Sequence, residues 1–413
     1  MSLFYNIGIR GYQLAIRLAA PFNEKAALWV KGRKNIREKI TQIQRKDERL
    51  VWFHAASLGE FEQGRPVIEA LKEAEPSTKI LLTFFSPSGY EIRKNYAGAD
   101  YILYLPADTP GNARFLVEQL KPDAAVFIKY EFWYNYLHEL YKHHIPTYLI
   151  SAIFRPEQAF FKSWGTLHRR MLGFFKRLFV QDEESVQLLN SIGIQNAERT
   201  GDTRFDRVKQ IAGAAKEIEK VKQFCDGHPA VVCGSTWPPD EDILLDYINS
   251  KDAGSYKWII TPHEIGENHI KTIQEKCKKK IIRYTDENAS LADYDVLIID
   301  CIGLLSSIYR YGQISYIGGG FGVGIHNTLE AAVYGIPVIF GPKYQKFNEA
   351  VNLIREGAAF SVNNGEQLRE VLDSLIQTPV ITETAGQKAR DYVDSQLGAT
   401  AIIIKELTRQ PEK

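Results

Sequence analysis

Residues 314–352 read ISYIGGGFGVGIHNTLEAAVYGIPVIFGPKYQKFNEAVN. The apolar run at their start predicts a strand that ends in a loop with glycines at positions 318, 319, 320, 322 and 324. A helix is predicted to open near His326 and Asn327, and a second strand covers Val338–Phe340. A strand, a loop, a helix and a further strand form the repeating unit of a parallel sheet. This stretch therefore favours an α/β fold.

The same alternation of short apolar runs and helical stretches extends outward from this segment. The runs are nearly continuous and rich in β-branched and aromatic residues, so they predict parallel sheets covered by helices on both faces. In the second half the predicted strands also include Ala230–Gly234, Trp258–Thr261, Lys280–Tyr284, Val296–Asp300, Ile314–Gly318 and Ala359–Val362. In the first half they are Val51–Ser57, Lys79–Ser86, Tyr101–Leu105, Ala124–Lys129, Thr147–Ala152 and Arg177–Gln181.

A charge-rich helical stretch at about Val208–Phe224, followed by Asp226, Gly227 and Pro229, separates the two halves. We therefore predict domains at 47–225 and 226–413, preceded by a separate segment at 1–46, with the last helix able to pack back on the N-terminal domain. Two doubly wound domains in tandem predict a cleft between the carboxyl ends of their strands, where such folds bind ligands.

The composition is that of an ordinary globular protein, with 413 residues, 45% hydrophobic and 24% charged. The net charge of +1 argues against a protein dedicated to nucleic acid. The four cysteines show no CxxC spacing and the nine histidines show no HxxxH or HExxH spacing, so neither a disulfide framework nor a zinc site is expected. Two DxD pairs, Asp240/Asp242 and Asp293/Asp295, are better explained as helix-start and turn acids than as metal ligands.

The basic charge is concentrated at one end. Residues 1–46 hold ten Lys or Arg against Glu24 and Glu38, a net charge of +8, so the remainder carries about −7. On a helix, Asn6, Arg10, Gln13 and Arg17 would form one polar stripe within a wide apolar surface. Such a helix, with basic residues, is typical of a segment that lies on an anionic membrane, and its arginines make it a poor spanning segment. The alternative is a helix packed on its own domain with a solvated basic face.

The glycine-rich loop is a candidate site for a nucleotide phosphate. Glycines allow close approach of the backbone, and a helix N-terminus offers unpaired N–H groups. The spacing fits neither GxGxxG nor a P-loop, which argues against nicotinamide and P-loop cofactors. Glu330 could accept hydrogen bonds from ribose hydroxyls; the alternative is a tight turn with a solvated glutamate.

Three charged residues in the first half follow predicted strands. Glu60, in HAASLGE, would lie at the carboxyl end of the first strand, where a carboxylate can serve as a general base or simply complement a helix dipole. Glu131, in KYEFWYNYL, also follows a predicted strand and opens a helix, so the same two interpretations apply to it. Arg204, in GDTRFD, is a cation between two acids in a turn.

Several motifs, in this order, resemble the 3-deoxy-D-manno-octulosonic acid (Kdo) transferases of lipopolysaccharide assembly. They are HAASLGE (54–60), YEFWYN (130–135), GDTRFD (201–206), GSTWPPDE (234–241), GGGFGVGIHNTLEAA (318–332) and FGPKYQKFNEA (340–350). The resemblance implies a GT-B glycosyltransferase with two Rossmann-like domains that transfers Kdo from CMP-Kdo to a lipid A precursor, with inversion and without a metal or other cofactor. The N-terminus resembles that family's membrane anchor, which implies a location on the cytoplasmic face of the bacterial inner membrane.

Matched position by position, the resemblance assigns Glu60 as general base, with Glu131 and Arg204 supporting the transition state. It also assigns a set of residues to CMP-Kdo: Ser235, Pro262, His263, Ile302, Gly303, Leu304, Gly319, Gly320, Asn327, Thr328, Leu329, Glu330 and Glu349.

The chain departs from the family pattern at several positions. His263 and Arg204 stand where the family commonly has Arg and Lys, Asp202 replaces an Asn, Trp237 replaces a His and Leu304 replaces an acid. Two other functions remain open. One is a GT-B enzyme for a UDP-sugar, either a transferase or an epimerase, and the other is a non-catalytic, membrane-bound nucleotide-sugar binding protein.

Overall fold

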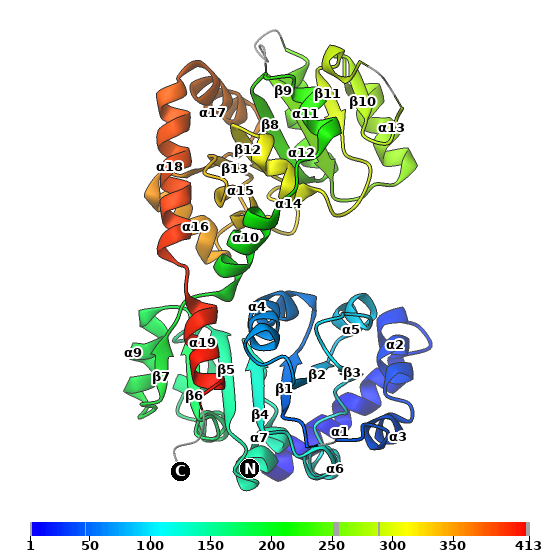
Figure 1. Ribbon diagram of the computed structural model, residues 1–413, viewed down its shortest axis with the longest axis vertical. Coiled ribbons are helices and arrows are strands. Elements are labelled where there is room, and N and C mark those ends of the chain that lie inside the picture. Colours follow the sequence, from blue (N-terminus) through cyan, green and yellow to red (C-terminus); the bar gives the residue numbers. More distant parts are fainter. Residues whose placement is uncertain (1, 46, 251–255, 288–289, 410–413) are drawn as a thin grey trace. The chain divides into compact units, whose positions relative to one another are not determined.

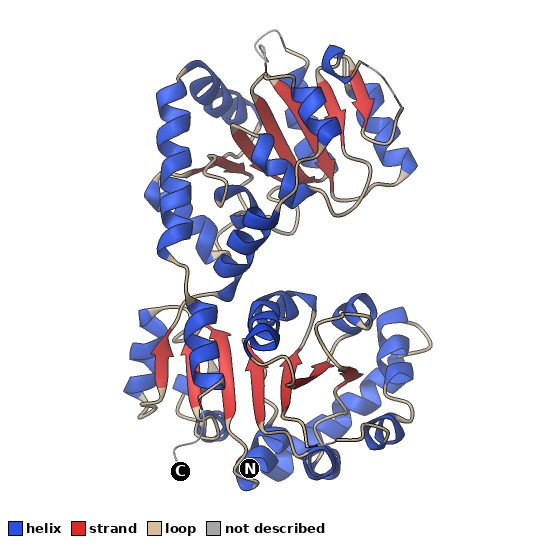
Figure 2. Ribbon diagram, in the orientation of Figure 1, coloured by secondary structure: helices blue, strands red, loops and turns tan. Residues whose placement is uncertain are grey.

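The structure is a computed structural model, and it describes residues 2–45, 47–250, 256–287 and 290–409. The chain forms two compact units, Met1–Asp206 with Leu397–Lys413, and Arg207–Gln396. Each unit contains one layer of strands with helices on both sides (Figures 1 and 2). We call them unit 1 and unit 2.

The sheet of unit 1 has seven parallel strands in the order β3-β2-β1-β4-β5-β6-β7. Their bounds are β1 Leu50–Ala55, β2 Lys79–Phe84, β3 Tyr101–Tyr104, β4 Ala124–Ile128, β5 Thr147–Ala152, β6 Arg177–Val180 and β7 Ala197–Arg199. Its helices are α1 Ser2–Ala19, α2 Glu24–Gly32, α3 Ile36–Thr41, α4 Leu58–Ala74, α5 Pro87–Arg93, α6 Pro110–Leu120, α7 Tyr134–Lys142, α8 Thr166–Leu172, α9 Glu183–Ser191 and α19 Ala399–Leu407.

The central strand β1 is buried on both faces because successive side chains alternate between two cores. Trp52 packs in a cluster with α6 and α7, whereas Val51 and Phe53 pack in a cluster with α4 and α19. This alternation explains why the strand is continuously apolar in sequence. The one polar side chain inside it, His54, is fully buried.

Unit 2 has a second all-parallel sheet of seven strands, in the order β10-β11-β9-β8-β12-β13-β14. Its strands are β8 Ala230–Thr236, β9 Lys257–Pro262, β10 Ile281–Arg283, β11 Val296–Ile298, β12 Ile314–Ile317, β13 Val338–Phe340 and β14 Ala359–Ser361. Its helices are α11 Glu219–Cys225, α12 Pro238–Ile248, α13 Glu267–Lys276, α14 Leu305–Ile308, α15 Leu329–Ala332, α16 Asn348–Glu356, α17 Gly365–Gln377 and α18 Pro379–Ser395, and α10 Thr203–Ala214 leads into the unit.

The division of the chain lies between Asp206 and Arg207, whereas the sequence predicted it at 225/226. The charge-rich stretch at 207–225 packs against unit 2, where the Ile218 backbone N–H donates to the Tyr311 hydroxyl at 2.6 Å. The last helix, α19, belongs to unit 1, where Ile403 and Leu407 join the core cluster of α4.

Two elements differ from the prediction. Strand β7 was not predicted, because it is short, lies at the edge of the sheet and contains Glu198 and Arg199. The helix expected near His326 begins only at Leu329 and has four residues, because the preceding loop continues to Thr328.

The N-terminal helix α1 has no buried residue. Leu3, Phe4 and Leu18 are 66%, 78% and 67% exposed. It is tied to unit 1 through Tyr5, whose hydroxyl donates to Asp108 Oδ2 at 2.6 Å. Among the helices that the structure describes, none has the length and apolar character needed to cross a membrane.

Candidate active site

Glu60 is the third residue of α4, the helix that directly follows β1. Its carboxylate turns back toward the start of the helix, where Oε2 accepts a hydrogen bond from the Ser57 backbone N–H at 3.1 Å and another from the Ser57 hydroxyl. Within the described residues Oε1 accepts no hydrogen bond. The two interpretations of Glu60 are therefore compatible, because one oxygen stabilises the helix start while the other remains available.

Glu131 follows β4 and is almost completely buried, with 8% of its surface exposed. Its Oε2 lies 3.0 Å from Nε2 of His54 and accepts the Trp133 indole N–H at 2.6 Å. On the other side of the His54 ring, Nδ1 lies 3.1 Å from the Thr83 carbonyl oxygen and 2.9 Å from its hydroxyl. Strands β1 and β2 thus fix the position of Glu131 through one imidazole.

Arg204 follows β7 and begins α10. Its guanidinium binds Asp202, with Nε and Nη2 both 2.8 Å from Oδ2. Asp202 is buried, and its two oxygens also accept the Gln63 side-chain amide at 3.2 Å each. Because Gln63 lies one turn after Glu60 on α4, a single helix carries Glu60 and holds the loop of Arg204.

The three predicted residues of unit 1 therefore gather at the carboxyl edge of its sheet. Tyr130, beside Glu131, senses the charges at this edge. Its pKa is raised, first by burial, while Arg155 opposes the rise and the charges of Asp202 and Glu60 add to it.

Two residues at this edge have a left-handed backbone that side chains rarely adopt. Lys129, which follows β4, has φ 66°, and Ser151 in β5 has φ 54°. Ser151 also marks a shift in the register between β5 and β6. In unit 2, Ser235 near the end of β8 has φ 52°. Non-glycine residues in this conformation cluster at functional sites, since the surrounding structure must hold them there.

The glycine-rich loop of unit 2 is packed backbone against backbone. A Cβ added at Gly318 would lie 2.2 Å from the Ser235 carbonyl oxygen, and one added at Gly320 would lie 2.6 Å from Gly341 Cα. Asp240 anchors the same loop: its Oδ2 accepts the Gly319 N–H at 2.8 Å and the Trp237 N–H at 3.0 Å. Burial raises the pKa of Asp240.

Three rings stack beside this loop. The centroids of Trp237 and His263 are 4.5 Å apart, as are those of His263 and His326. The Trp237 indole N–H donates to Nε2 of His326 at 3.0 Å, which requires that nitrogen to be unprotonated. Burial, and then the charge of His263, lowers the pKa of His326 to about 4.

The residues predicted to bind CMP-Kdo all lie in unit 2. Most are in the loops after β9, β11 and β12; Ser235 and Pro262 lie at the ends of β8 and β9, Leu329 and Glu330 begin α15, and Glu349 is in α16. Their accessibility differs: Ile302 is 88% exposed and His263 is exposed, whereas Thr328 and Leu329 are fully buried. These last two residues are therefore inaccessible to a ligand in this structure. Asn327 donates to Glu330 Oε1 at 2.9 Å.

Asp240 and Asp242, the first of the two DxD pairs considered as metal ligands, bind other groups of the protein. Asp240 binds the loop, and Asp242 forms an ion pair with Lys276 at 2.5 Å. No cluster of three or more His, Cys, Asp or Glu suited to a metal ion occurs in the described part of the chain.

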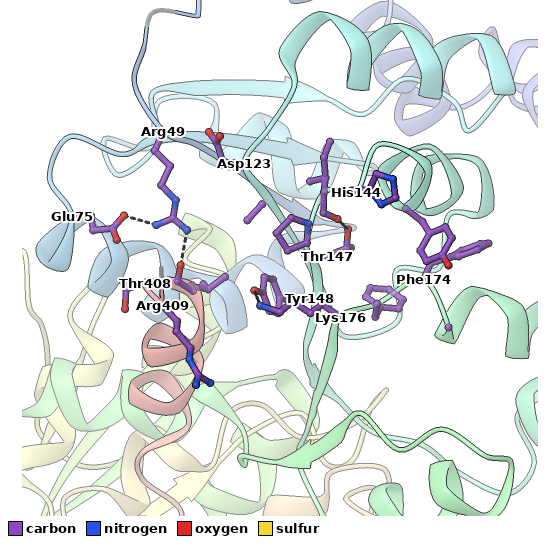
Figure 3. Close-up of a pocket in the computed structure, with 17 residues that line it drawn as sticks. Arg49, Glu75, Asp123, His144, Thr147, Tyr148, Phe174, Lys176, Thr408 and Arg409 are labelled. Atoms are coloured by element: carbon purple, nitrogen blue, oxygen red, sulfur yellow. Dashed lines mark hydrogen bonds and ion pairs between the residues drawn. The ribbon is translucent and has the colours of Figure 1, made fainter. Parts of the chain in front are cut away.

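A cavity of about 840 Å³ lies at the opposite edge of the unit 1 sheet, near the amino ends of its strands (Figure 3). Its charged groups are paired within the protein: Arg49 binds Glu75 and the Leu407 carbonyl oxygen, and Lys176 binds Glu406. The cavity thus lies away from the edge that carries the predicted residues.

The partners of the candidate side chains, namely His54, Trp133 and Gln63, were not predicted from the sequence. His54 had a signal, since it is the polar residue in the otherwise apolar strand LVWFHA. Gln63 had none, because an amide in an amphipathic helix is usually solvated.

Comparison with known proteins identifies relatives of this chain. A family model described as 3-deoxy-D-manno-octulosonic-acid transferase (kdotransferase) matches residues 34–207, which include the three charged residues of unit 1. A 3-deoxy-D-manno-octulosonic acid transferase of Rickettsia typhi is 30% identical over 79% of this chain and 72% of that protein. One of Aquifex aeolicus is 28% identical over 79% of this chain and 86% of that protein.

Among solved structures, a UDP-GlcNAc 2-epimerase of Neisseria meningitidis superposes with a TM-score of 0.63 at 18% identity, over 87% of this chain and all of that one. At this identity the likeness concerns the fold, which is the two-domain α/β fold of the GT-B type. The sequence relatives show that the chain belongs to the 3-deoxy-D-manno-octulosonic acid (Kdo) transferase family.

Proposed function

We propose that this protein transfers Kdo from CMP-Kdo to a hydroxyl group of a lipid A precursor, lipid IVA, with inversion, in lipopolysaccharide core assembly. Membership of the Kdo transferase family supports the reaction class. The observation that carries the mechanism is the orientation of Glu60, which keeps one carboxylate oxygen in the helix start and leaves the other without a hydrogen bond among the described residues.

In this mechanism Oε1 of Glu60 accepts the proton of the acceptor hydroxyl as its oxygen attacks the anomeric carbon of Kdo. The bond from that carbon to the CMP phosphate breaks, and its electron pair leaves with CMP. An oxocarbenium-like transition state needs one base for the incoming hydroxyl and stabilisation of the departing anion. Arg204, held by Asp202, supplies a fixed positive charge.

Unit 2 would bind the nucleotide through its loops. The glycine loop allows the backbone to approach a phosphate closely, since a side chain at Gly318 or Gly320 would collide with neighbouring backbone. The stacked rings of Trp237, His263 and His326 border that loop. No metal is required by this scheme.

The direct test is an assay with CMP-Kdo generated in situ and a tetra-acylated lipid A precursor, read by mass spectrometry. A mass gain of one or more Kdo units is expected. No gain with intact CMP binding would point to another acceptor, and the number of units added would give the processivity.

A UDP-sugar enzyme is the second candidate, because the fold is shared with the UDP-GlcNAc 2-epimerase. Thermal shift with CMP and with UDP separates the two, since a ligand raises the melting temperature according to its affinity for the folded state. We expect stabilisation by CMP. Stabilisation by UDP alone would favour the second candidate.

We also propose that residues 2–46 lie on the anionic cytoplasmic face of the bacterial inner membrane. The exposed apolar side chains of α1 and the exposed Arg10 and Arg17 support this. Each basic residue near such a surface contributes roughly 1 kcal/mol. The protein should co-sediment with anionic liposomes, and replacement of Arg10 and Arg17 by Glu should release it. Failure of the unaltered protein to sediment would contradict the proposal.

A further inference from the structure

His54 and Glu131 form a buried pair in unit 1, and hydrogen-bond donors and acceptors determine where its protons lie. Nδ1 of His54 lies 3.1 Å from the Thr83 carbonyl oxygen, which only accepts, and 2.9 Å from the Thr83 hydroxyl, which can donate or accept, so Thr83 holds this side of the ring whichever tautomer is present. An indole N–H can only donate, so the 2.6 Å contact from Trp133 makes Glu131 Oε2 an acceptor.

The same oxygen of Glu131 lies 3.0 Å from His54 Nε2. Two acceptors at this distance would repel each other, so a proton must lie between them. Trp133 cannot supply it. Its nitrogen is also 3.1 Å from His54 Nε2, but its single proton is committed to the shorter contact with Glu131. The geometry therefore assigns the proton to Nε2, which donates it to Oε2 of Glu131.

The second oxygen of Glu131 is in a different situation. Oε1 accepts no hydrogen bond from any residue that the structure describes, although 8% of the residue is exposed. This oxygen is open to solvent and can accept a hydrogen bond from a ligand, and a sugar hydroxyl is such a donor.

We propose that His54 is a positioning residue of the transfer reaction. By donating from Nε2 to Oε2, it holds the carboxylate so that Oε1 of Glu131 is presented to a sugar hydroxyl. The inference rests on the proposed function, because the sugar hydroxyl belongs to the substrates of that reaction. Among the described residues, Tyr5 of α1 also responds to the charge of Glu131: its pKa is raised by burial first, then by Asp108 and in smaller part by Glu131.

Unit 2 contains a matched pair with no open oxygen. His269 has Nδ1 2.8 Å from the Glu264 carbonyl oxygen and Nε2 2.7 Å from Glu241 Oε2, and Glu241 Oε1 accepts the Thr236 hydroxyl at 2.9 Å. Both oxygens of Glu241 are therefore occupied. The His269 pair has the same construction, without an oxygen for a ligand, and serves as the internal control.

The first test is whether Nε2 of His54 carries a proton, measured by nitrogen NMR on protein labelled at histidine. We expect Nε2 to be protonated at pH 7, and its signal to shift in Glu131→Gln, because its acceptor changes from a carboxylate to an amide oxygen. The signal is assigned by its absence in His54→Gln or, if that variant does not fold, by its change in Glu131→Gln. An unprotonated Nε2 at pH 7 in the unaltered protein would overturn the proposal. This measurement does not depend on activity.

The second test is kinetic. His54→Gln should lower kcat by up to about a hundredfold, because a displaced reactive group is costly, and should add little to the defect of Glu131→Gln in the double variant. His269→Gln should lower thermal stability and leave kcat nearly unchanged. Additive losses in the double variant would contradict a role through Glu131. Absence of transfer by the unaltered protein would instead count against the proposed function and leave the NMR result standing.

Discussion

Units 1 and 2 each contain a seven-stranded parallel sheet, but different types of residue lie at the carboxyl edges of the two sheets. In unit 1 that edge carries charged side chains, each held by a neighbour, as Glu60 is held by Ser57 and Arg204 by Asp202. In unit 2 it carries glycine backbone packed against backbone, together with stacked rings. The difference fits the roles that we propose, in which unit 1 supplies groups for proton and charge transfer and unit 2 supplies a surface for close approach.

The strongest test of this division is Glu60→Gln. Removing a general base should reduce Kdo transfer by about a thousandfold, because acid–base catalysis typically contributes 10² to 10⁴. CMP affinity, which we assign to unit 2, should not change. Mass spectrometry of the product and calorimetry with CMP would measure the two effects.

Glu62→Gln is the matched control for that experiment. Glu62 lies on the same helix and pairs with Arg93 at 2.7 Å, away from Ser57. Its replacement should leave transfer almost unaffected. Near-normal turnover in Glu60→Gln, or equal losses in both variants, would remove Glu60 as the base.

The corresponding change in unit 2 is Gly320→Ala. The new Cβ would lie 2.6 Å from backbone atoms of Gly341, so the loop must move. Overpacking of this kind costs about 1–3 kcal/mol, which we expect as a lower melting temperature and a CMP affinity reduced by about tenfold or more. Gly322→Ala, whose Cβ would be 3.4 Å from the Gly319 carbonyl oxygen, should be nearly neutral. Equal effects of the two substitutions would argue against the packed loop as the binding element.

A smaller effect is expected from Gln63→Leu in unit 1. The side chain is 1% exposed and donates to both oxygens of Asp202, so its loss leaves that carboxylate with fewer donors and loosens Arg204. We expect kcat to fall by about tenfold with CMP affinity unchanged, since misplaced groups reduce rate more than binding. Gln210→Leu, on the exposed face of α10, is the control. A change in CMP affinity instead of kcat would break the separation between the units.

Most strands of the two sheets could be predicted from the sequence, because both sheets are buried on two faces. Central strands such as β1 and β8 are then continuously apolar, whereas β7, short and polar at its sheet edge, gave no such pattern. The location of Glu60, Glu131 and Arg204 was also predictable, because the carboxyl ends of parallel strands meet at one edge.

What holds these residues could not be predicted in the same way. His54 meets Glu131 across 77 positions of the chain, and Gln63 meets Asp202 across 139. Such contacts depend on strand order and on the exact rotation of a helix, which periodicity does not encode. The helix expected at His326 begins later for a related reason: the His326 N–H donates to the Gly318 carbonyl oxygen at 3.1 Å and its ring accepts from Trp237, and both contacts hold this residue in the loop.

The smallest effect that we expect is a loss of stability of unit 2 at acid pH, caused by His326. The pKa of His326 is lowered to about 4 in the folded protein from an ordinary value of 6.5. At pH values between these two, the unfolded chain binds a proton at His326 that the folded chain does not. The contribution of His326 to the free energy of unfolding is therefore fully present above about pH 6.5 and is lost as the pH falls toward 4. The ring is partly exposed, and solvent screening should keep the loss to about 1 kcal/mol.

Urea unfolding at pH 7.5, 6, 5 and 4 would measure this loss, and His326→Gln should remove that part of the pH dependence. Trp237→Phe sharpens the comparison, because it deletes the indole N–H that donates to the neutral imidazole while keeping a ring in the stack. If the stack is what keeps His326 neutral, this variant should lose stability at pH 7.5 and depend less on pH. An unchanged slope in both variants would show that His326 is not the titrating group, and that the acid sensitivity of unit 2 arises in its carboxylates.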